Sequence, residues 1–469
     1  NFCTTKCIRN NGEVSSLMAS KSKAVAESQI YDVDTSSTGV FDLPAGTTAQ
    51  RPGSPNSGQT RFNTETGSIE FYDGNAWIQT NLVPNITSIT GEINNTYATN
   101  LVFAVTSNTN NVDVIFSEGG STFHTVSSQA VTGGSFTLAV PAQVYGQTAG
   151  DSIVISIRNS DGTLSDNTIT KTVLGAPTGG TIVLSGGKRY HTFTSSSNFV
   201  TAANWPSTTV EYLYVAGGGG GSGDLGGGGG AGGHVTGNFT TTANSTYAAE
   251  VGGGGAGGAG IRSASSSGVD GNQSRLTLSG STVGTAAVGG GTSGHYNDGS
   301  ATHGGGHAGG SGGGGGASDA SRAGGLGTSG QGNAGGAGGY APYYHGGGGG
   351  GAGAAGASAN GTSIAGIGGV GTTTYDAWGA ATSTGENVSG TRYFSGGGGG
   401  GSYNANSVTG FADGGHGGGG EGWGNSNLAT AGTANTGGGG GGGGYNHGGP
   451  APTAGAAGGS GIVILRYNI

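Results

Sequence analysis

Three histidines in the second half of the chain have the residue type and approximate spacing of metal ligands. His303 and His307 lie four residues apart, with His295 shortly before them. Two histidines at this spacing converge on one ion only on a helix or a tight turn, and here glycines separate them. The nearest carboxylate is Asp298. Because a closed zinc site needs about four ligands, the sequence predicts no metal site.

A glycine pattern after a strand-like segment imitates a dinucleotide-binding fingerprint. Tyr212–Val215 is followed by Gly217, Gly219 and Gly221. The fingerprint requires a helix that opens at the glycines and an acidic residue about 20 positions later. Here more glycine follows, and then a segment that is typical of a strand. The pattern therefore predicts no nucleotide site, and we expect no cofactor.

Catalytic patterns are equally weak. The sequence contains no nucleophile elbow of the Gly-x-Ser-x-Gly type. No pair of carboxylates stands out as a glycosidase site, although such pairs can be distant in sequence. The sequence therefore predicts a protein that is not an enzyme.

Aromatic and imidazole side chains form islands between the glycine runs, and they are the best candidates for recognition. Loops held by a rigid scaffold are common binding positions, and aromatic residues among small polar neighbours adapt well to a partner. The alternative is that these rings cover the glycine scaffold, and both interpretations can hold for different loops. The candidate receptor-binding residues are Tyr340, Tyr343, Tyr344, His345, Tyr375, Trp378, Arg392, Tyr393, Phe394, Trp423, Tyr445 and His447.

The scaffold that would hold these residues is defined by glycine. Of the 115 glycines, 95 follow Val215, about five times the usual frequency. Runs of up to eight glycines favour neither helix nor ordinary strand. Flexible linkers mix glycine with serine, whereas these runs recur between strand signals. Extended threefold helices have outward-pointing backbone groups that must be paired, and pure glycine lets them pack on all sides. We therefore expect a lattice of polyglycine II helices.

Strand signals frame this region and define a domain over residues 177–469. Lys188–Thr194, Asn198–Thr201 and Val210–Ala216 precede it, and Ile462–Tyr467 follows it. We expect the last segment to pair with one of the earlier ones. Further strand-like segments inside the region are His234–Thr242, Tyr247–Val251 and Arg275–Leu278.

Residues 84–176 are typical of an all-β domain. Alternating apolar residues predict strands, and Gly119-Gly120, Gly133-Gly134 and Asp161-Gly162 mark turns. About seven short strands in this length favour an immunoglobulin-like sandwich without the antibody disulfide, with a spacer role. The clearest strand signals are Leu101–Val105, Val112–Phe116, Ser135–Val140 and Ile153–Ile157.

Residues 41–83 predict a small β-hairpin module. Thr60–Asn63 and Ser68–Tyr72 are strand candidates, and Asp73-Gly74-Asn75 predicts a turn before Trp77. A unit this small is marginal alone, so we expect it to associate into a homotrimer that buries its aromatic residues. Residues 1–40 are weakly patterned, with one short helical stretch from Ser20 to Ile30, and predict an attachment segment.

Composition excludes several other classes. Charged residues are 8 % of the chain and the net charge is −9, without a Lys/Arg cluster, so a nucleic-acid partner is not expected. No apolar run reaches the roughly 18 residues of a membrane helix, and no signal peptide is visible. Cys3 and Cys7 suggest a local disulfide or two free thiols. The chain begins at Asn1 without methionine, as a processed or partial chain would.

Two parts of the chain resemble bacteriophage tail-fibre proteins. Pro44, Gly46–Ala49 with Arg51-Pro52, Arg61–Thr64 and Tyr72–Trp77 resemble a small module of tail-fibre and tail-collar proteins. The glycine-rich region, with its closing Gly-Ser-Gly-Ile-Val-Ile-Leu-Arg-Tyr, resembles the domain at the ends of phage fibres, including tip adhesins with stacked polyglycine helices. Those adhesins lack the front modules found here.

This resemblance implies a virion fibre protein that binds a host cell-surface receptor, either a saccharide or an outer-membrane protein. It also implies contact with other virion proteins through the N-terminal segment and a location on the tail fibre. The alternatives are a purely structural fibre or decoration protein, or a cellular surface adhesin. An ice-binding protein would need a regular repeat with a flat threonine face, which this sequence lacks.

Overall fold

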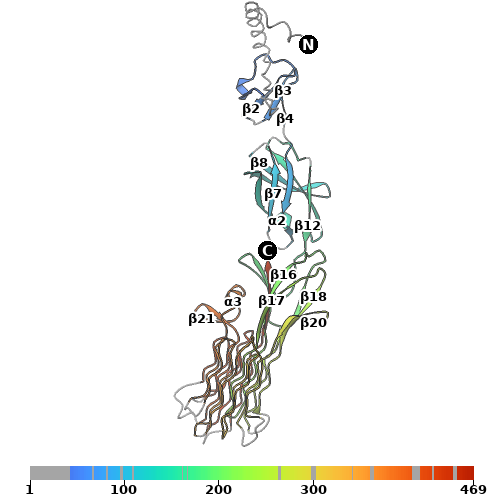
Figure 1. Ribbon diagram of the computed structural model, residues 1–469. Coiled ribbons are helices and arrows are strands. Elements are labelled where there is room, and N and C mark those ends of the chain that lie inside the picture. Colours follow the sequence, from blue (N-terminus) through green and yellow to red (C-terminus); the bar gives the residue numbers. More distant parts are fainter. Residues whose placement is uncertain are drawn as a thin grey trace, which may run out of the picture. The chain divides into compact units, whose positions relative to one another are not determined.

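The computed structural model describes residues 43–469 apart from short gaps, and these residues form two compact units that divide between Val173 and Leu174 (Figure 1). The expected attachment segment at 1–40 lies outside the described residues. Strands far outnumber helices, as expected for an all-β chain. The gaps fall at 66–67, 81–82, 96–98, 108–109, 161, 166, 262–265, 297–302, 341, 360–363, 404–411, 425–426 and 447–451.

A four-stranded sheet forms the hairpin module at the start of the first unit. Its order is β1-β2-β3-β4, with β1 parallel to β2 and the other pairs antiparallel. Both central strands have the predicted bounds, and a single 3-10 turn (Thr48–Gln50) follows β1. The strands are β1 (Ala45–Gly46), β2 (Thr60–Asn63), β3 (Ser68–Tyr72) and β4 (Trp77–Thr80).

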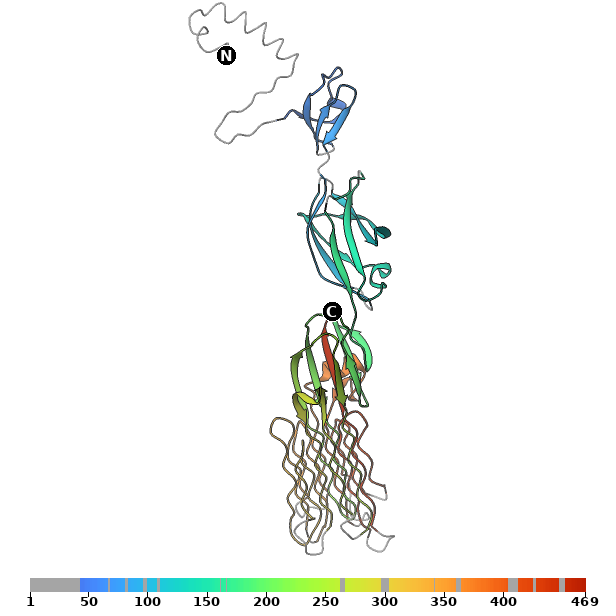
Figure 2. The ribbon, with the colours of Figure 1, turned by 90° about the vertical axis from the view of Figure 1, so that its right-hand side faces the viewer.

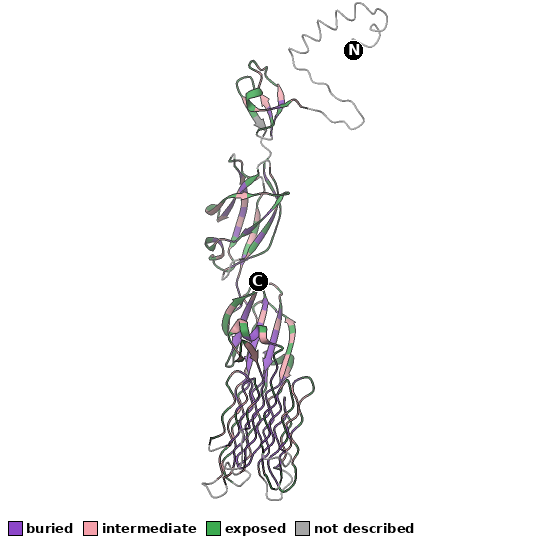
Figure 3. Cartoon of the chain, turned by 90° about the vertical axis from the view of Figure 1, so that its left-hand side faces the viewer, coloured by how far each residue is buried: buried purple, intermediate pink, exposed green. Residues whose placement is uncertain are grey.

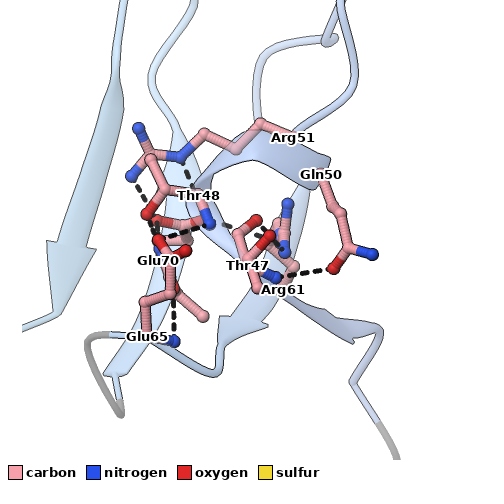
Figure 4. Close-up of polar contacts among 8 residues, drawn as sticks. Thr47, Thr48, Gln50, Arg51, Arg61, Glu65 and Glu70 are labelled. Atoms are coloured by element: carbon pink, nitrogen blue, oxygen red, sulfur yellow. Dashed lines mark hydrogen bonds and ion pairs between the residues drawn. The ribbon is translucent and has the colours of Figure 1, made fainter.

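The interior of this module is polar. Glu70 is fully buried and accepts hydrogen bonds from Arg51 (2.6 Å) and Asn63 (3.1 Å), with Arg61 3.4 Å away (Figure 4). The apolar side chains alternate to the other face of the sheet, where Phe62 pairs with Ile69 and both are exposed. Among the described side chains of the module, none that is apolar is buried.

The rest of the first unit is a sandwich of two sheets over one apolar core. A short helix, α2 (Ala142–Tyr145), lies between β10 and β11. The three-stranded sheet runs β10 (Ser135–Ala139), β7 (Asn100–Thr106), β5 (Asn85–Thr90). The five-stranded sheet runs β6 (Ile93–Asn94), β12 (Ile169–Leu174), β11 (Ser152–Asn159), β8 (Asn111–Glu118), β9 (Ser121–Ala130).

Alternation along these strands explains the sandwich. Leu101, Phe103 and Val105 point into the core from β7, while Val102 points out and is exposed. Phe103 stacks on Phe136 of the neighbouring strand with ring centroids 4.6 Å apart. All four strongest strand predictions in this region are confirmed.

A central five-stranded sheet organises the second unit. Its order is β13-β14-β23-β16-β17, so the last strand lies between two strands from the start of the unit. The predicted pairing of Ile462–Tyr467 is thereby confirmed on both sides. These strands are β13 (Thr181–Ser185), β14 (Lys188–Phe193), β23 (Ile462–Asn468), β16 (Thr209–Val215) and β17 (His234–Thr240).

Both faces of this sheet are covered, which explains why β16 and β23 are almost continuously apolar. One face packs on a four-stranded sheet, with Tyr212, Tyr214 and Val463 in the shared core. The other face packs under a short helix and a hairpin. The covering strands are β15 (Ser197–Val200), β18 (Thr246–Glu250), β19 (Ser274–Leu278) and β20 (Ser281–Ala287), and the opposite cover is α3 (Asp376–Thr382), β21 (Glu386–Val388) and β22 (Thr391–Tyr393).

Beyond the strands, the glycine runs lie side by side as extended segments (Figure 2). In the run Gly217–Gly221, the N–H groups of Gly217 and Gly220 donate to Asn272 and Val269, whereas those of Gly218 and Gly221 donate to Gly459 and Ala456. N–H groups three residues apart in the run therefore donate to carbonyls of the same neighbouring segment. The carbonyls of this run accept from still other segments, at Gly290, Gly255 and Gly440.

Glycine is required by this arrangement rather than merely tolerated. The runs are almost entirely buried (Figure 3). A Cβ atom on Gly218 would overlap the carbonyl of Gly438, and one on Gly220 would overlap that of Ala256. The interior of this region is therefore made of backbone, and its cohesion comes from backbone hydrogen bonds.

Candidate recognition site

The end of the glycine lattice that points away from the sheets is defined by a tight turn. The run that leaves β16 reverses at Ser222–Leu225, where Asp224 and Leu225 have positive φ, and returns to β17. We call this the distal end. The N–H of Tyr296 donates to the Asp224 carbonyl (3.0 Å), and that of Gly443 donates to the Ser222 carbonyl (2.8 Å). Segments that are far apart in sequence therefore end together here.

Four tyrosines from four such segments form a continuous row at the distal end. We call Tyr296, Tyr344, Tyr403 and Tyr445 the tyrosine row. Successive ring centroids are 6.0, 5.9 and 6.0 Å apart, the first two contacts edge-to-face and the last stacked. All four side chains are partly exposed. Ring contacts of this kind orient each aromatic side chain against the next.

Backbone bonds fix the row further. Tyr403 and Tyr445 are linked as a parallel bridge, and the Tyr445 N–H donates to the Ser402 carbonyl at 3.1 Å. The Tyr344 hydroxyl donates to Asp319 at 3.0 Å, and this hydrogen bond raises the tyrosine pKa. The row is therefore held by the scaffold before any partner arrives.

The segment Tyr340–His345 contributes exposed and buried members. Tyr340 and Tyr343 are 45 % and 43 % exposed. His345 is buried, which lowers its pKa to about 4, and its Nδ1 accepts the Tyr403 N–H at 3.2 Å. The imidazole is therefore neutral at physiological pH and holds the backbone of Tyr403. The Tyr343 ring stacks on the His345 ring with centroids 6.4 Å apart.

Trp423 is buried, and its indole lies where a Cβ on Gly444 would be. The tryptophan therefore covers the glycine run that leads to Tyr445. His447, another predicted site residue, lies outside the described residues.

The remaining predicted site residues lie at the opposite end of the lattice. Tyr375, Trp378 and Phe394 are buried against β14, β16 and β23 and form the core under α3. Arg466 lies 3.9 Å from the Trp378 ring centroid. These three aromatic side chains therefore cover the central sheet, whereas the alternative left open by the sequence was that they cover the glycine lattice.

Arg392 and Tyr393, on β22, are only partly exposed. Arg392 donates to the Gly385 carbonyl at 3.1 Å, and Tyr393 contacts His416 with ring centroids 5.6 Å apart. The predicted residues at the distal end are therefore Tyr340, Tyr343, Tyr344, His345 and Tyr445. Those near α3 and β22 lie apart from them: Tyr375, Trp378, Arg392, Tyr393 and Phe394.

Sequence reasoning missed two members of the row. Tyr296 and Tyr403 were not among the predicted residues, although Tyr403 follows a six-glycine run much as Tyr445 follows an eight-glycine run. Tyr403 and Tyr445 thus share a signal, an aromatic residue just after a long glycine run, that Tyr296 and Tyr344 lack.

The histidine cluster does not form a metal centre in the described part of the chain. His295 and His303 stack with ring centroids 5.7 Å apart, and His307 faces Asp270 at 3.3 Å. No group of three or more His, Cys, Asp or Glu side chains there is placed to hold an ion. In the same residues, no helix has the length and apolar character to cross a membrane.

Comparison with known proteins gives one match. The family model described as a glycine-rich domain matches residues 192–468. No curated protein and no solved structure matches the chain.

Proposed function

The chain belongs to the glycine-rich domain family, and from that premise we propose that it is a virion fibre protein that binds a host cell-surface receptor with its distal end. The observation that carries this proposal is the set of tyrosines, with Tyr340 and Tyr343 exposed, at the end of a scaffold almost free of side chains. Exposed aromatic groups on a rigid support are typical anchors of binding interfaces. The chain then acts by binding and catalyses no reaction.

We infer that the glycine runs are polyglycine II helices. The return of each hydrogen-bond acceptor to the same neighbour every third residue matches a threefold helix. Such a lattice is rigid without side-chain packing, so the distal loops can vary while the support stays the same.

We infer that the sandwich is an immunoglobulin-like spacer. Its two antiparallel sheets share one core over about 90 residues, which fits that architecture. Its exposed surface offers no aromatic cluster comparable to the distal end among the residues described.

We propose that the hairpin module joins three chains into a homotrimer on the virion, with the N-terminal segment contacting other virion proteins. The support is that the module has polar side chains inside and apolar ones outside. Glu70, Arg61 and Asn63 are buried. The exposed fractions of Phe62, Ile69 and Ile78 are 36, 41 and 40 %. Burying charges costs free energy and exposed apolar area contributes none, so association would supply the missing stabilisation. Light scattering of the full chain should give three times the monomer mass, and a monomer at high micromolar concentration would contradict the assembly.

The direct test of receptor binding uses the full chain labelled with a fluorophore and a panel of bacterial strains. We expect binding to some strains, and loss of that binding in the double variant Tyr340→Ser, Tyr343→Ser with an unchanged melting temperature. Tyr393→Ser, at the other end of the same domain, is the control and should bind normally. A wild-type chain that labels the fibres of intact particles but binds no cell would support the alternative of a purely structural or decoration protein. An antibody to the chain that labels the surface of the cells producing it, with no labelling of particles, would support a cellular adhesin.

A further inference from the structure

We propose that the tyrosine row binds a neutral saccharide chain on the host surface. This inference rests on the proposed receptor-binding function and specifies the chemistry of the ligand. Its basis is the order of Tyr296, Tyr344, Tyr403 and Tyr445, whose ring contacts repeat at about the same spacing across four segments of the chain. A row of evenly spaced rings fits a ligand that also has repeating units.

The ring chemistry suits a sugar. The face of a tyrosine ring carries partial negative charge, and the axial C–H groups of a pyranose present partial positive charge and an apolar surface. Stacking therefore needs no charged partner on either side. The phenol hydroxyls beside the rings donate and accept hydrogen bonds, as sugar hydroxyls require. Each residue of the row therefore offers a ring face for stacking and a hydroxyl for hydrogen bonding.

The row is also ordered before binding. Tyr403 is fixed by its N–H bond to buried His345, Tyr445 by its bridge to Tyr403, and Tyr344 by its bond to Asp319. The backbone of the row is held in this way and its rings contact one another, which reduces the entropic cost of a weak stacking contact.

Charge argues for a neutral sugar over an acidic one. The described basic residues of this unit are few, and most lie on the strands far from the distal end: Lys188, Arg189, Arg275, Arg392 and Arg466. The exception, Arg322, donates to Ser318 and packs along Gly304. Among the described residues, the carboxylate of Asp319 accepts a hydrogen bond from Tyr344 of the row. A phosphate or a uronic acid would meet repulsion from that carboxylate.

An outer-membrane protein is the competing ligand class. Tyrosine also anchors protein partners, but a protein surface does not repeat at a fixed interval, whereas the ring contacts of the row do. Exposed aliphatic side chains of this unit, such as Ile261 and Leu428, are not part of the row. We therefore favour the saccharide, and the experiment below separates the two.

The experiment measures binding of the full chain to a strain that it recognises, after two treatments of the cells. Periodate cleaves sugar diols, and proteinase K digests exposed protein. We expect periodate to abolish binding, proteinase K to leave it, and the neutral polysaccharide released from those cells by mild acid to compete. Binding that survives periodate and is lost after proteinase K would overturn the saccharide proposal and leave the receptor function standing. Failure to bind any strain would overturn the receptor function and this proposal with it.

Variants of the row connect this result to the residues. Tyr403→Ala and Tyr445→Ala should each weaken competition by the polysaccharide roughly tenfold, the size of one lost aromatic contact. Tyr403→Phe keeps the ring and should retain most of the affinity for the polysaccharide. This variant tests the proposal even if Tyr403→Ala folds poorly. Tyr393→Ala, a half-buried tyrosine at the other end of the domain, is the matched control. Equal affinity of the alanine variants, the phenylalanine variant and wild type would overturn the proposal.

Discussion

The sandwich and the glycine lattice of this chain are stable interiors built on opposite principles. In the sandwich, Phe103, Phe116 and Ile155 fill the space between two sheets, and cohesion comes from apolar burial. In the lattice, Gly218, Gly220 and their neighbours leave no space for any side chain, and cohesion comes from hydrogen bonds between runs. One interior is specified by side-chain shape and the other by the absence of side chains.

The difference predicts how each interior responds to substitution. A side-chain core fails when atoms are removed, because a cavity is left. A backbone lattice fails when atoms are added, because the carbonyl of the next run occupies the position of the new Cβ. The four predictions below test this contrast, beginning with the largest expected effect.

A branched residue inside the lattice should prevent the glycine-rich domain from folding. A Cβ on Gly348 would overlap the Ile367 carbonyl, and one on Gly440 the Ala456 carbonyl. We therefore expect Gly348→Val and Gly440→Val to remove the cooperative melting transition of the second unit in calorimetry, while the sandwich transition remains. If both variants melt like wild type, the runs do not pack as described.

The opposite change should damage the sandwich alone. Phe103→Ala removes a fully buried ring that stacks on Phe136 at 4.6 Å. We expect the free energy of unfolding of the sandwich to fall by about 3–5 kcal/mol, measured by denaturant titration of the full chain. The transition of the glycine-rich domain should not move, and a shift of both transitions would mean that the two interiors are not independent.

Two adjacent glycines give the sharpest comparison within the lattice. A Cβ on Gly252 would overlap the Asn272 carbonyl, whereas one on Gly253 would meet nothing nearer than the Asn272 amide at 3.7 Å. Gly252→Ala should cost about 1–3 kcal/mol, and Gly253→Ala should change stability by less than about 0.5 kcal/mol. Similar melting temperatures for these two variants would argue that flexibility, not packing, explains the glycine content.

The hairpin module offers a third kind of interior, which should respond to acid. Burial alone would raise the pKa of Glu70, but hydrogen bonds from Arg51 and Asn63, together with the charges of Arg51 and Arg61, lower it below its usual 4.5. The ionised carboxylate therefore stabilises the module above that pH, and the stabilisation is lost as the pH falls through the lowered value. We expect the fluorescence of Trp77 to report this loss in acid. The same titration in Glu70→Gln should lack the step, and an identical step in that variant would assign it to another group.

Sequence patterns predicted the strands well where alternation or continuous apolar runs were present. Ile462–Tyr467 was expected to pair with one of the strands before the glycine region, and β23 pairs with both β14 and β16. Ser281–Ala287 was not predicted as a strand, because small residues and Gly284 give little alternation.

The site was predicted less completely. Trp378 and Phe394 stand out in a glycine-rich sequence as much as Tyr343 does, but burial depends on which end of the lattice each one reaches. The end that each of these residues reaches depends on where its glycine run reverses direction. For these residues no local sequence pattern encodes that point. In the module, alternation along β2 and β3 separates polar from apolar side chains, but only the path of residues 44–59 determines that the polar face is the covered one.

Hydrogen exchange of the glycine amides tests the central claim most directly. The N–H groups of Gly398, Gly440 and Gly442 donate to carbonyls of neighbouring runs at 2.9–3.0 Å, and the runs 396–401 and 437–444 are buried. In the native full chain we predict that these amides exchange as slowly as those of β16 and β23. Exchange of the two runs at the rate of an unstructured peptide would show that the glycines are flexible, and would contradict a lattice held together by its backbone.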